Sequence, residues 1–197
     1  PRVSDLVFEG GIRNFVSFLN EQKHSDLVHE DVIYMRGEKG TSQAEVALQY
    51  NTSYNETILT FANNMNTIEG GTHETGFRTA LTKVLNDYAR RTEVLKEKDP
   101  NFNGEDFREG MTAIIAIKMQ NIQFEGQTKA KLGSVEARPA VETIISEQLE
   151  KFLDDPKNQQ IGAAILAKAV AAAKVREAAK KAKDIARKKN SLDVTAL

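Results

Sequence analysis

The residues best placed to do chemistry lie in a ten-residue segment, 124–133, between an apolar stretch and an amphipathic one. Gly126 and Gly133 lie within it and allow backbone conformations with positive φ. Gln127 and the threonine after it supply neutral hydrogen-bonding groups beside the long, positively charged side chain of Lys129. This combination suits recognition of a terminal phosphate, although a lysine in a glycine-bounded loop is by itself more typical of solvated surface.

A helix is predicted directly after this segment. Ser134 suits the N-cap, Glu136 suits the first turn, and Pro139 is tolerated only near a helix start. Apolar residues then recur at helical spacing until Pro156 ends the helix. Backbone amides and the dipole at a helix N-terminus attract anions, so the position of Lys129 before this helix also favours a phosphate ligand.

A second polar segment, residues 69–78, contains two glycines, a histidine and an arginine. Gly70 and Gly71 predict a turn that needs unusual φ angles. His73 is predicted to be a loop or helix-capping histidine, and Arg78 is predicted to lie off the apolar face of the helix that follows. Taken alone, these residues are compatible with an ordinary loop and an exposed helical arginine.

The other candidate sites are weak. His24 and His29 have no acidic or cysteine partner at metal-ligand spacing and are predicted to be surface residues. The carboxylates of Glu105, Asp106 and Glu109 fall in a hydrophilic connection and are predicted to be solvated. No metal site is predicted. The common phosphate-loop, dinucleotide, zinc-protease and hydrolase motifs do not occur, so the chain is not expected to be a complete enzyme.

The charge of the chain is divided between a basic end and an acidic body. Residues 168–189 contain nine Lys or Arg and two acidic residues, a net charge of +7, so the remaining residues carry −8. A helix expected over 157–189 would be about 50 Å long and is expected to project from the domain. Such a helix suits nucleic-acid phosphates, while a plain solvated helix and a helix that packs on a partner are alternatives. One basic stripe along it would consist of Arg176, Lys180, Lys183 and Arg187.

The 197 residues suffice for one domain with an extension. The turn-forming residues 51–55 predict that the strands on either side of them are antiparallel neighbours in a meander. A later strand is apolar on both faces, which predicts a central position. Besides the helices described above, helices are expected over 12–21 and 76–91, and strands over 32–35, 45–50, 57–62 and 111–119.

The sequence contains no cysteine and no apolar run of the roughly 20 residues that a membrane span needs. No signal-peptide core follows Pro1. A cytoplasmic protein without a membrane partner is therefore expected.

Three motifs, in their order, carry a family resemblance. They are Glu69-Gly70-Gly71-Thr72-His73, Thr75-Gly76-Phe77-Arg78 and the string from Gln123 to Gly133. Together they closely resemble the ATPase subunit of bacterial type IIA topoisomerases, which is the B subunit of DNA gyrase or of topoisomerase IV. The resemblance runs from about Phe8 to the C-terminus and matches only the second, transducer domain of that subunit, so the chain looks like an excised fragment.

The resemblance implies an α+β fold like the second domain of ribosomal protein S5. This fold is a mostly antiparallel sheet backed by helices, here with a long C-terminal helix. The transducer domain would occupy residues 1–155. Residues 156–197 would be the long basic helix, which leads towards a DNA-cleavage core further along the subunit.

The resemblance also implies roles for single residues. Gln127 and Lys129 would contact the γ-phosphate of ATP, and Lys129 would act catalytically by stabilising developing negative charge. ATP and Mg²⁺ would be bound mainly by a domain upstream of Pro1. The residues implied to bind DNA are Arg78, by its match to the family, and Arg176, Lys180, Lys183 and Arg187 on the basic helix.

The implied partners are double-stranded DNA, the upstream ATPase domain and a DNA-cleaving subunit with which the full enzyme forms a heterotetramer. The full subunit would be an ATP-hydrolysing DNA topoisomerase, an isomerase, whereas this fragment alone would be inactive. The loop around Lys129 would hold two domains in one orientation while ATP is bound and release them after hydrolysis.

Two questions stay open at the level of sequence. Asn121-Ile122 stands where family members often have Asp-Pro, and gyrase is not separated from topoisomerase IV, although the residues after Arg187 lean towards gyrase. A different hypothesis is a free-standing nucleic-acid-binding or scaffold module that acts through its basic helix, with Lys129 as ordinary surface.

Overall fold

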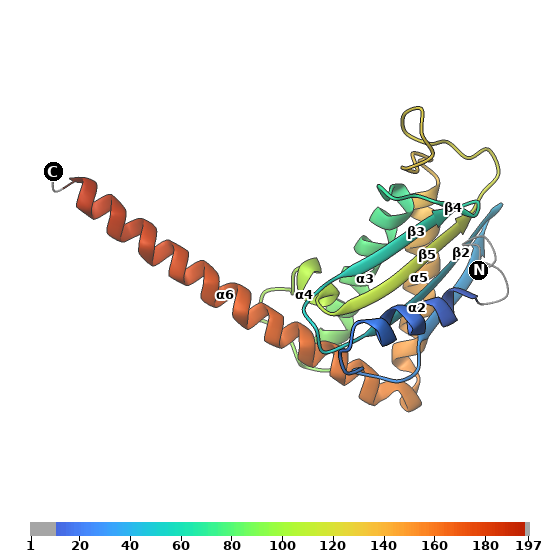
Figure 1. Cartoon of the computed structure of the whole chain (residues 1–197). Coiled ribbons are helices and arrows are strands. Elements are labelled where there is room, and N and C mark those ends of the chain that lie inside the picture. The colour runs from blue at the N-terminus through green and yellow to red at the C-terminus, as the bar shows by residue number, and fades with distance from the viewer. Residues whose placement is uncertain (1–10, 196–197) are drawn as a thin grey trace.

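The computed structural model describes residues 11–195. The expected helices and strands are present, with some ends shifted by several residues, whereas the predicted start of the resemblance at Phe8 lies outside the described residues. In chain order (Figure 1) the elements are α2 (Gly11–Gln22), β1 (Ile33–Lys39), β2 (Ser42–Tyr50), β3 (Thr57–Ala62), β4 (Met65–Asn66), α3 (Thr72–Arg91), α4 (Gly104–Arg108), β5 (Met111–Lys118), α5 (Ala137–Asp154), the 3₁₀ helix η1 (Pro156–Asn158) and α6 (Gln159–Thr195).

The strands form one five-stranded sheet in the order β1-β2-β5-β3-β4. Neighbouring strands are antiparallel except β3 and β5, which run parallel with Thr57 opposite Thr112. The prediction that β2 and β3 are neighbours in a meander is wrong, because β5 lies between them. All but the last residue of β5 are buried, and a strand that is apolar on both faces belongs where both faces are covered. The predicted central position of β5 is confirmed.

Helices cover both faces of the sheet (Figure 1). Successive residues of a strand point to opposite faces, so the central strand contributes to two apolar clusters. Ile115 of β5 belongs to the larger cluster, which it forms with α3, α5 and the start of α6. The adjacent Ile114 belongs to the smaller cluster, together with Ile12 and Val16 of α2. The predicted α+β fold, a mostly antiparallel sheet backed by helices, is therefore confirmed.

α3 and α5 lie close together on one face of the sheet. Gly76 permits this approach, because a Cβ at this position would lie 2.6 Å from the carbonyl oxygen of Arg138. Ser134 was predicted to cap α5, and this prediction is wrong. Its side chain is buried, and its Oγ accepts a hydrogen bond of 2.8 Å from the backbone N–H of Gln123. Ser134 thereby ties the two ends of the connection between β5 and α5 together.

His29 is buried, although the sequence predicted a surface residue. Its Nε2 accepts a hydrogen bond of 3.1 Å from the backbone N–H of Tyr50, and its Nδ1 lies 2.7 Å from the carbonyl oxygen of Asp31. Burial lowers the pKa of His29. The His29 side chain thus bonds two backbone groups near the point where the chain enters the sheet. Sequence spacing alone does not reveal these partners. His24 is exposed, as predicted.

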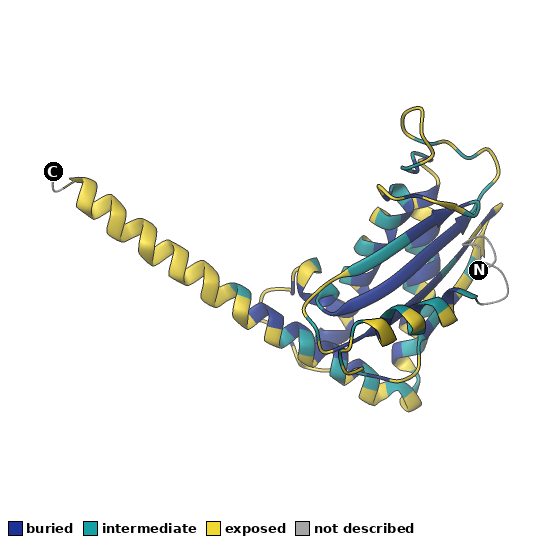
Figure 2. Cartoon of the chain, viewed as in Figure 1, coloured by how far each residue is buried: buried dark blue, intermediate teal, exposed yellow. Residues whose placement is uncertain are grey.

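α6 packs on the body only along its first half. Ile165, Leu166 and Ala169 are buried, whereas every described residue from 177 onwards is exposed (Figure 2). At 1.5 Å per residue the 37-residue helix is about 55 Å long. The predicted projecting helix is confirmed. Within residues 11–195, no helix is both long enough and apolar enough to cross a membrane.

Candidate functional site

Residues 124–133, here called the lysine loop, connect the sheet to α5. The loop is closed at its base by backbone hydrogen bonds. The N–H of Glu125 donates to the carbonyl oxygen of Lys131 at 2.8 Å, and the N–H of Gly133 donates to that of Gln123 at 2.9 Å. An ion pair of 3.1 Å joins the side chains of Lys131 and Glu125 across the same neck. The loop therefore has a fixed base below its tip.

Glycines set the backbone of the loop and of the segment beside it. Gly126 has a φ of 75°, and Gly70 and Gly71 have φ angles of 74° and 142°, as predicted for turns that need unusual conformations. Gly133 is not among the residues with positive φ, so the freedom that the sequence allowed there is not used. A Cβ on Gly133 would instead lie 3.0 Å from the side chain of Glu125.

The lysine loop rests on residues 67–73, here called the glycine segment. The N–H of Leu132 donates to the carbonyl oxygen of Gly70 at 3.0 Å, and the carbonyl oxygen of Leu132 accepts from the N–H of Thr72 at 3.1 Å. A Cβ on Gly71 would lie 2.4 Å from the same Leu132 oxygen, so only glycine permits the approach. The two polar segments recognised in the sequence therefore lie side by side.

The tip of the lysine loop presents its polar side chains to solvent. Gln127, Thr128 and Lys129 are exposed, and within the described part of the chain none of the three side chains forms a hydrogen bond or ion pair. Figure 1 shows the loop at the end of the sheet away from α6. An ammonium group beside an amide and a hydroxyl can contact the oxygens of an anion that approaches from outside the domain.

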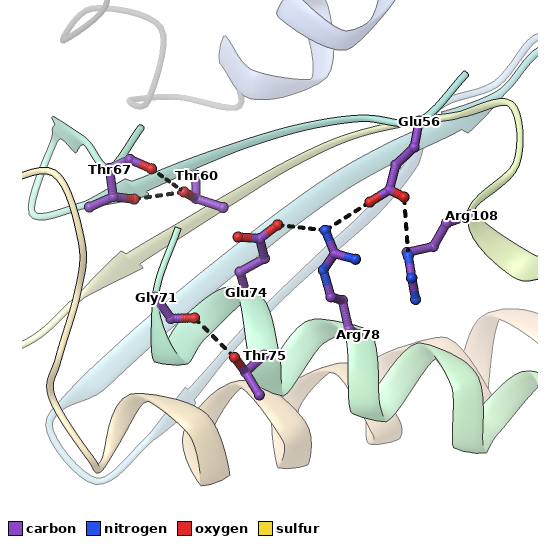
Figure 3. Close-up of polar contacts among 8 residues, drawn as sticks. All are labelled: Glu56, Thr60, Thr67, Gly71, Glu74, Thr75, Arg78 and Arg108. Atoms are coloured by element: carbon purple, nitrogen blue, oxygen red, sulfur yellow. Dashed lines mark hydrogen bonds and ion pairs between the residues drawn. The ribbon is translucent and has the colours of Figure 1, made fainter. Parts of the chain in front are cut away.

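His73 is buried in the first turn of α3, not in a loop or cap as predicted. Its Nε2 lies 3.0 Å from the Oγ1 of Thr67, which in turn lies 2.7 Å from the hydroxyl of Thr60 (Figure 3). Its Nδ1 has no hydrogen-bond partner among the described residues. Burial lowers the pKa of His73 to about 4, so the ring is neutral at pH 7. His73 thus joins α3 to the glycine segment from the inside.

Arg78 lies in a cluster of alternating charges, which Figure 3 shows. Its Nη2 is 2.8 Å from one oxygen of Glu56 and 2.9 Å from an oxygen of Glu74. The other oxygen of Glu56 is 3.3 Å from the Nε of Arg108. The sequence predicted an exposed arginine, whereas the Arg78 side chain is 37% exposed and doubly paired. Any contact of Arg78 with an anion therefore competes with two carboxylates.

Arg176 fixes the point where α6 leaves the body. Its Nε and Nη2 lie 3.1 and 3.0 Å from the two carboxylate oxygens of Asp106 in α4. The same carboxylate accepts a hydrogen bond of 2.9 Å from the backbone N–H of Asn103. Asp106 is only 3% exposed, so the prediction that it is solvated is wrong. Its hydrogen bonds raise the pKa of Arg176.

The predicted basic stripe is therefore divided. Arg176 is bound to Asp106, whereas Lys180, Lys183 and Arg187 are exposed and have no hydrogen-bond or ion-pair partner in residues 11–195. The free part of the stripe is the part on the projecting half of α6. An exposed row of cations of this kind can contact successive phosphates of a nucleic acid without reading its sequence.

The sequence reasoning did not name Glu56 or Glu74 and did not predict that Asp106 binds an arginine. Glu74 precedes Arg78 by four helical positions, a spacing that the sequence could have revealed. Glu56 and Asp106 reach their arginines from distant parts of the chain, which only the fold brings together. In the described residues, no group of three or more His, Cys, Asp or Glu side chains could hold a metal ion, and none was predicted.

Comparison with known proteins gives strong matches. The family model described as DNA gyrase B matches residues 11–185. The B subunit of DNA gyrase from Clostridium acetobutylicum is 51% identical over 191 residues, which are 96% of this chain and 29% of that protein. The protein of the same name from Bacillus mycoides is 50% identical over 190 residues, 96% of this chain and 46% of that protein. The chain thus spans less than half the length of these curated relatives.

Solved structures agree with these matches. The 43K ATPase domain of Thermus thermophilus gyrase B, in complex with an aminocoumarin, has a TM-score of 0.81 at 39% identity, covering 90% of this chain and 46% of that chain. The B subunit of DNA gyrase from Myxococcus xanthus has a TM-score of 0.65 at 23% identity, covering 81% of this chain and 48% of that chain. The second likeness supports the fold alone.

Proposed function

Because the chain belongs to the DNA gyrase B family, we propose that it is the transducer domain of the ATP-hydrolysing subunit of a bacterial type II DNA topoisomerase. In this role it couples ATP binding and hydrolysis in a preceding domain to the movements that pass one DNA duplex through another. The matching family model is that of gyrase, so we favour gyrase over topoisomerase IV. In this proposal the transducer domain comprises residues 1–155 and the basic C-terminal segment comprises residues 156–197, of which α6 covers Gln159–Thr195.

The observation that carries the proposed role is the lysine loop. Its base is held by backbone hydrogen bonds to itself and to the glycine segment, while Gln127 and Lys129 are exposed at its tip. A fixed base with a free cationic tip is the arrangement needed to contact an anion held by another domain. Such a contact lasts only while the anion is present, so it can switch the orientation of two domains.

Lys129 and Gln127 fit the terminal phosphate of ATP, because an ammonium and an amide N–H donate hydrogen bonds to phosphate oxygens. Lys129 stabilises the negative charge that develops during phosphoryl transfer and moves no proton itself. The rest of ATP, together with Mg²⁺, is bound mainly by the preceding domain. The dipole of α5, which begins at Ala137, adds to the attraction for an anion near this end of the molecule.

Double-stranded DNA is the second partner in this proposal. The exposed cations of α6, Lys180, Lys183 and Arg187, contact duplex phosphates, and Arg78 contributes from the body. The other partners are the ATPase domain that precedes this chain and the DNA-cleaving subunit of the heterotetramer. The enzyme works in the cytoplasm, and this chain without the ATPase domain does not hydrolyse ATP.

The test is ATP turnover by this chain joined behind the ATP-binding domain of a gyrase B relative. Replacement of Lys129 by alanine is expected to lower kcat about 100-fold or more while ATP binding is largely kept, because a charge contact to the transition state is lost. Lys131→Ala is the matched control in the same loop. Its ion pair with Glu125 is lost but its backbone hydrogen bond at the base of the loop remains, so a change of only a few-fold is expected.

Unchanged turnover in the Lys129→Ala protein would contradict the proposed role of the loop. The favoured hypothesis would then be a free-standing nucleic-acid-binding or scaffold module that acts through the exposed basic stripe of α6. In that case duplex affinity would depend on Lys180, Lys183 and Arg187, and ATP would have no effect on any property of the chain.

A further inference from the structure

A polar pocket of about 500 Å³, here called the α3–α4 pocket, lies where α3 meets α4, away from the lysine loop. Three of its lining residues are cations, Arg78, Lys83 and Arg108, and one is an acid, Asp87. The remaining lining side chains are neutral hydroxyls and amides. A lining with three cations and one acid suits an oxyanion, although Glu56 and Glu74 already pair with Arg78 at its edge.

Arg108 is the least exposed of the three cations that line this pocket. Its side chain is only 14% exposed, and its position on the short helix α4 is fixed because α4 is bound to α6 through Asp106 and Arg176. Among the described residues its only polar contact runs from Nε to Glu56, which leaves the two terminal nitrogens of the guanidinium free. A planar fork of N–H donors matches two oxygens of a phosphate group.

Glu56 already occupies the place that an anion would take. Its carboxylate bridges Arg78 at 2.8 Å and Arg108 at 3.3 Å. The second distance exceeds the 2.7–2.9 Å that is usual for a strong charge-assisted hydrogen bond, so the Arg108 contact is the weaker of the two. The Glu56 side chain is 31% exposed, so it can turn outwards into solvent.

We infer that the α3–α4 pocket binds a phosphate oxyanion through Arg108 and Arg78, and that Glu56 is a built-in competitor which keeps this binding weak. An arriving phosphate takes the guanidinium contacts, and the Glu56 carboxylate moves into water. The oxyanion belongs to a nucleic-acid backbone or is free phosphate. The first source rests on the proposed function, whereas the competition by Glu56 does not.

The experiment measures the affinity of a short fluorescent DNA duplex by anisotropy. It uses the full chain with Lys180, Lys183 and Arg187 replaced by glutamine, which lowers the contribution of α6 equally in all the variants compared. In this background Glu56→Gln is expected to tighten binding about tenfold and to steepen the dependence of log K on log salt by about 1, because one more phosphate contact forms. Glu142→Gln is the matched control, since Glu142 pairs with Arg138 on a different helix at 2.9 Å. It is expected to change affinity less than twofold.

Arg108→Gln added to Glu56→Gln is expected to remove the gain. If the Glu56→Gln and Glu142→Gln proteins bind the duplex with equal affinity, the oxyanion does not come from a nucleic-acid backbone. The NMR resonance of the Arg108 Nε–H during titration with inorganic phosphate then decides the site. A shift that is larger in the Glu56→Gln chain than in the chain with Glu56 means that the pocket takes free phosphate, whereas an equal shift or no shift overturns the proposal.

A loss of fold in the Glu56→Gln protein would show in its circular dichroism. The second variant is then Arg108→Gln in the chain with an intact Glu56, followed at the Nε–H of Arg78, which lines the same pocket and whose weak shift with inorganic phosphate is expected to be lost. Failure here is distinguishable from failure of the proposed function, because the Lys129→Ala comparison of ATP turnover does not involve the α3–α4 pocket.

Discussion

His73 couples the stability of the chain to pH. Burial holds its pKa at about 4, below the ordinary value of 6.5, so the unfolded chain takes up a proton at this residue before the folded chain does. The free energy of unfolding therefore has its full value, as far as His73 is concerned, above pH 6.5, and it decreases as pH falls from 6.5 towards 4. Over that window it amounts to about 3 kcal/mol.

We expect His73→Gln to remove this part of the pH dependence, because glutamine can still bond Thr67 but does not titrate in the window. The measurement is the free energy of unfolding in urea at a series of pH values from 7 to 4.5. The difference between the two proteins should shrink as pH falls. His24→Gln, at an exposed position, is the control for the loss of a histidine. If the free energy of unfolding depends on pH in the same way with and without His73, the ring is not buried in solution.

Sequence reasoning located the lysine loop and the glycine segment, and it predicted the exposure of His24 correctly. It misjudged His29, His73 and Asp106, which are all polar residues that the fold buries. Residues of these types are predicted to lie on the surface, because burying a polar group without a hydrogen-bond partner destabilises the fold. Their partners are backbone groups or side chains from other elements, so the compensation is invisible until the fold is known.

The five-residue helix α4 is held mainly by its contacts with longer elements. Asp106 caps its own helix through Asn103 and binds the guanidinium of Arg176 on α6. Asp106→Asn keeps the shape of the side chain but loses the charge-assisted hydrogen bonds to Arg176. We therefore expect the free energy of unfolding to decrease by about 2 kcal/mol.

Chemical denaturation measures this loss, and hydrogen exchange locates it. Faster exchange is expected for the amides of α6 before Arg176, which depend on α4 for cover. Asp184→Asn is the control, because Asp184 is exposed on the projecting half of the same helix. Equal stability of the two variants would show that the Asp106–Arg176 pair contributes nothing beyond solvent-exposed pairs.

The position of β5 shows where local patterns stop being informative. Residues 51–55 are turn formers and do reverse the chain, so β2 and β3 run in opposite directions as predicted. A turn does not determine whether the two strands touch. β5, which comes about fifty residues after that turn, inserts between them because its apolar faces need cover on both sides. Here the backbone N–H of Asn51 bonds the carbonyl oxygen of Gly110 at 2.9 Å, just before β5 begins.

At the level of the whole molecule, six of the nine Lys and Arg residues of α6 lie on its exposed part, from residue 177 onwards. Replacing Lys180, Lys183 and Arg187 by glutamine is expected to weaken duplex binding and to reduce the slope of log K against log salt by up to about 3, at roughly 0.9 per phosphate contact. Anisotropy titrations at several salt concentrations measure the slope.

Arg176→Gln is the informative comparison for this prediction. Its guanidinium is bound to Asp106, so the substitution should lower the melting temperature and change the salt slope little. A slope that falls as much for Arg176 as for one of the exposed cations would mean that the pair with Asp106 opens when DNA binds.

The ion pair between Arg176 and Asp106 also marks the point from which the projecting part of α6 extends. Residues 177–195 extend about 28 Å beyond it as a single rigid helix. A rotation of about 10° at the base moves the tip by about 5 Å. The projecting helix therefore has the geometry of a lever arm, whose base is held by the Arg176–Asp106 pair together with the buried residues of the first half of α6.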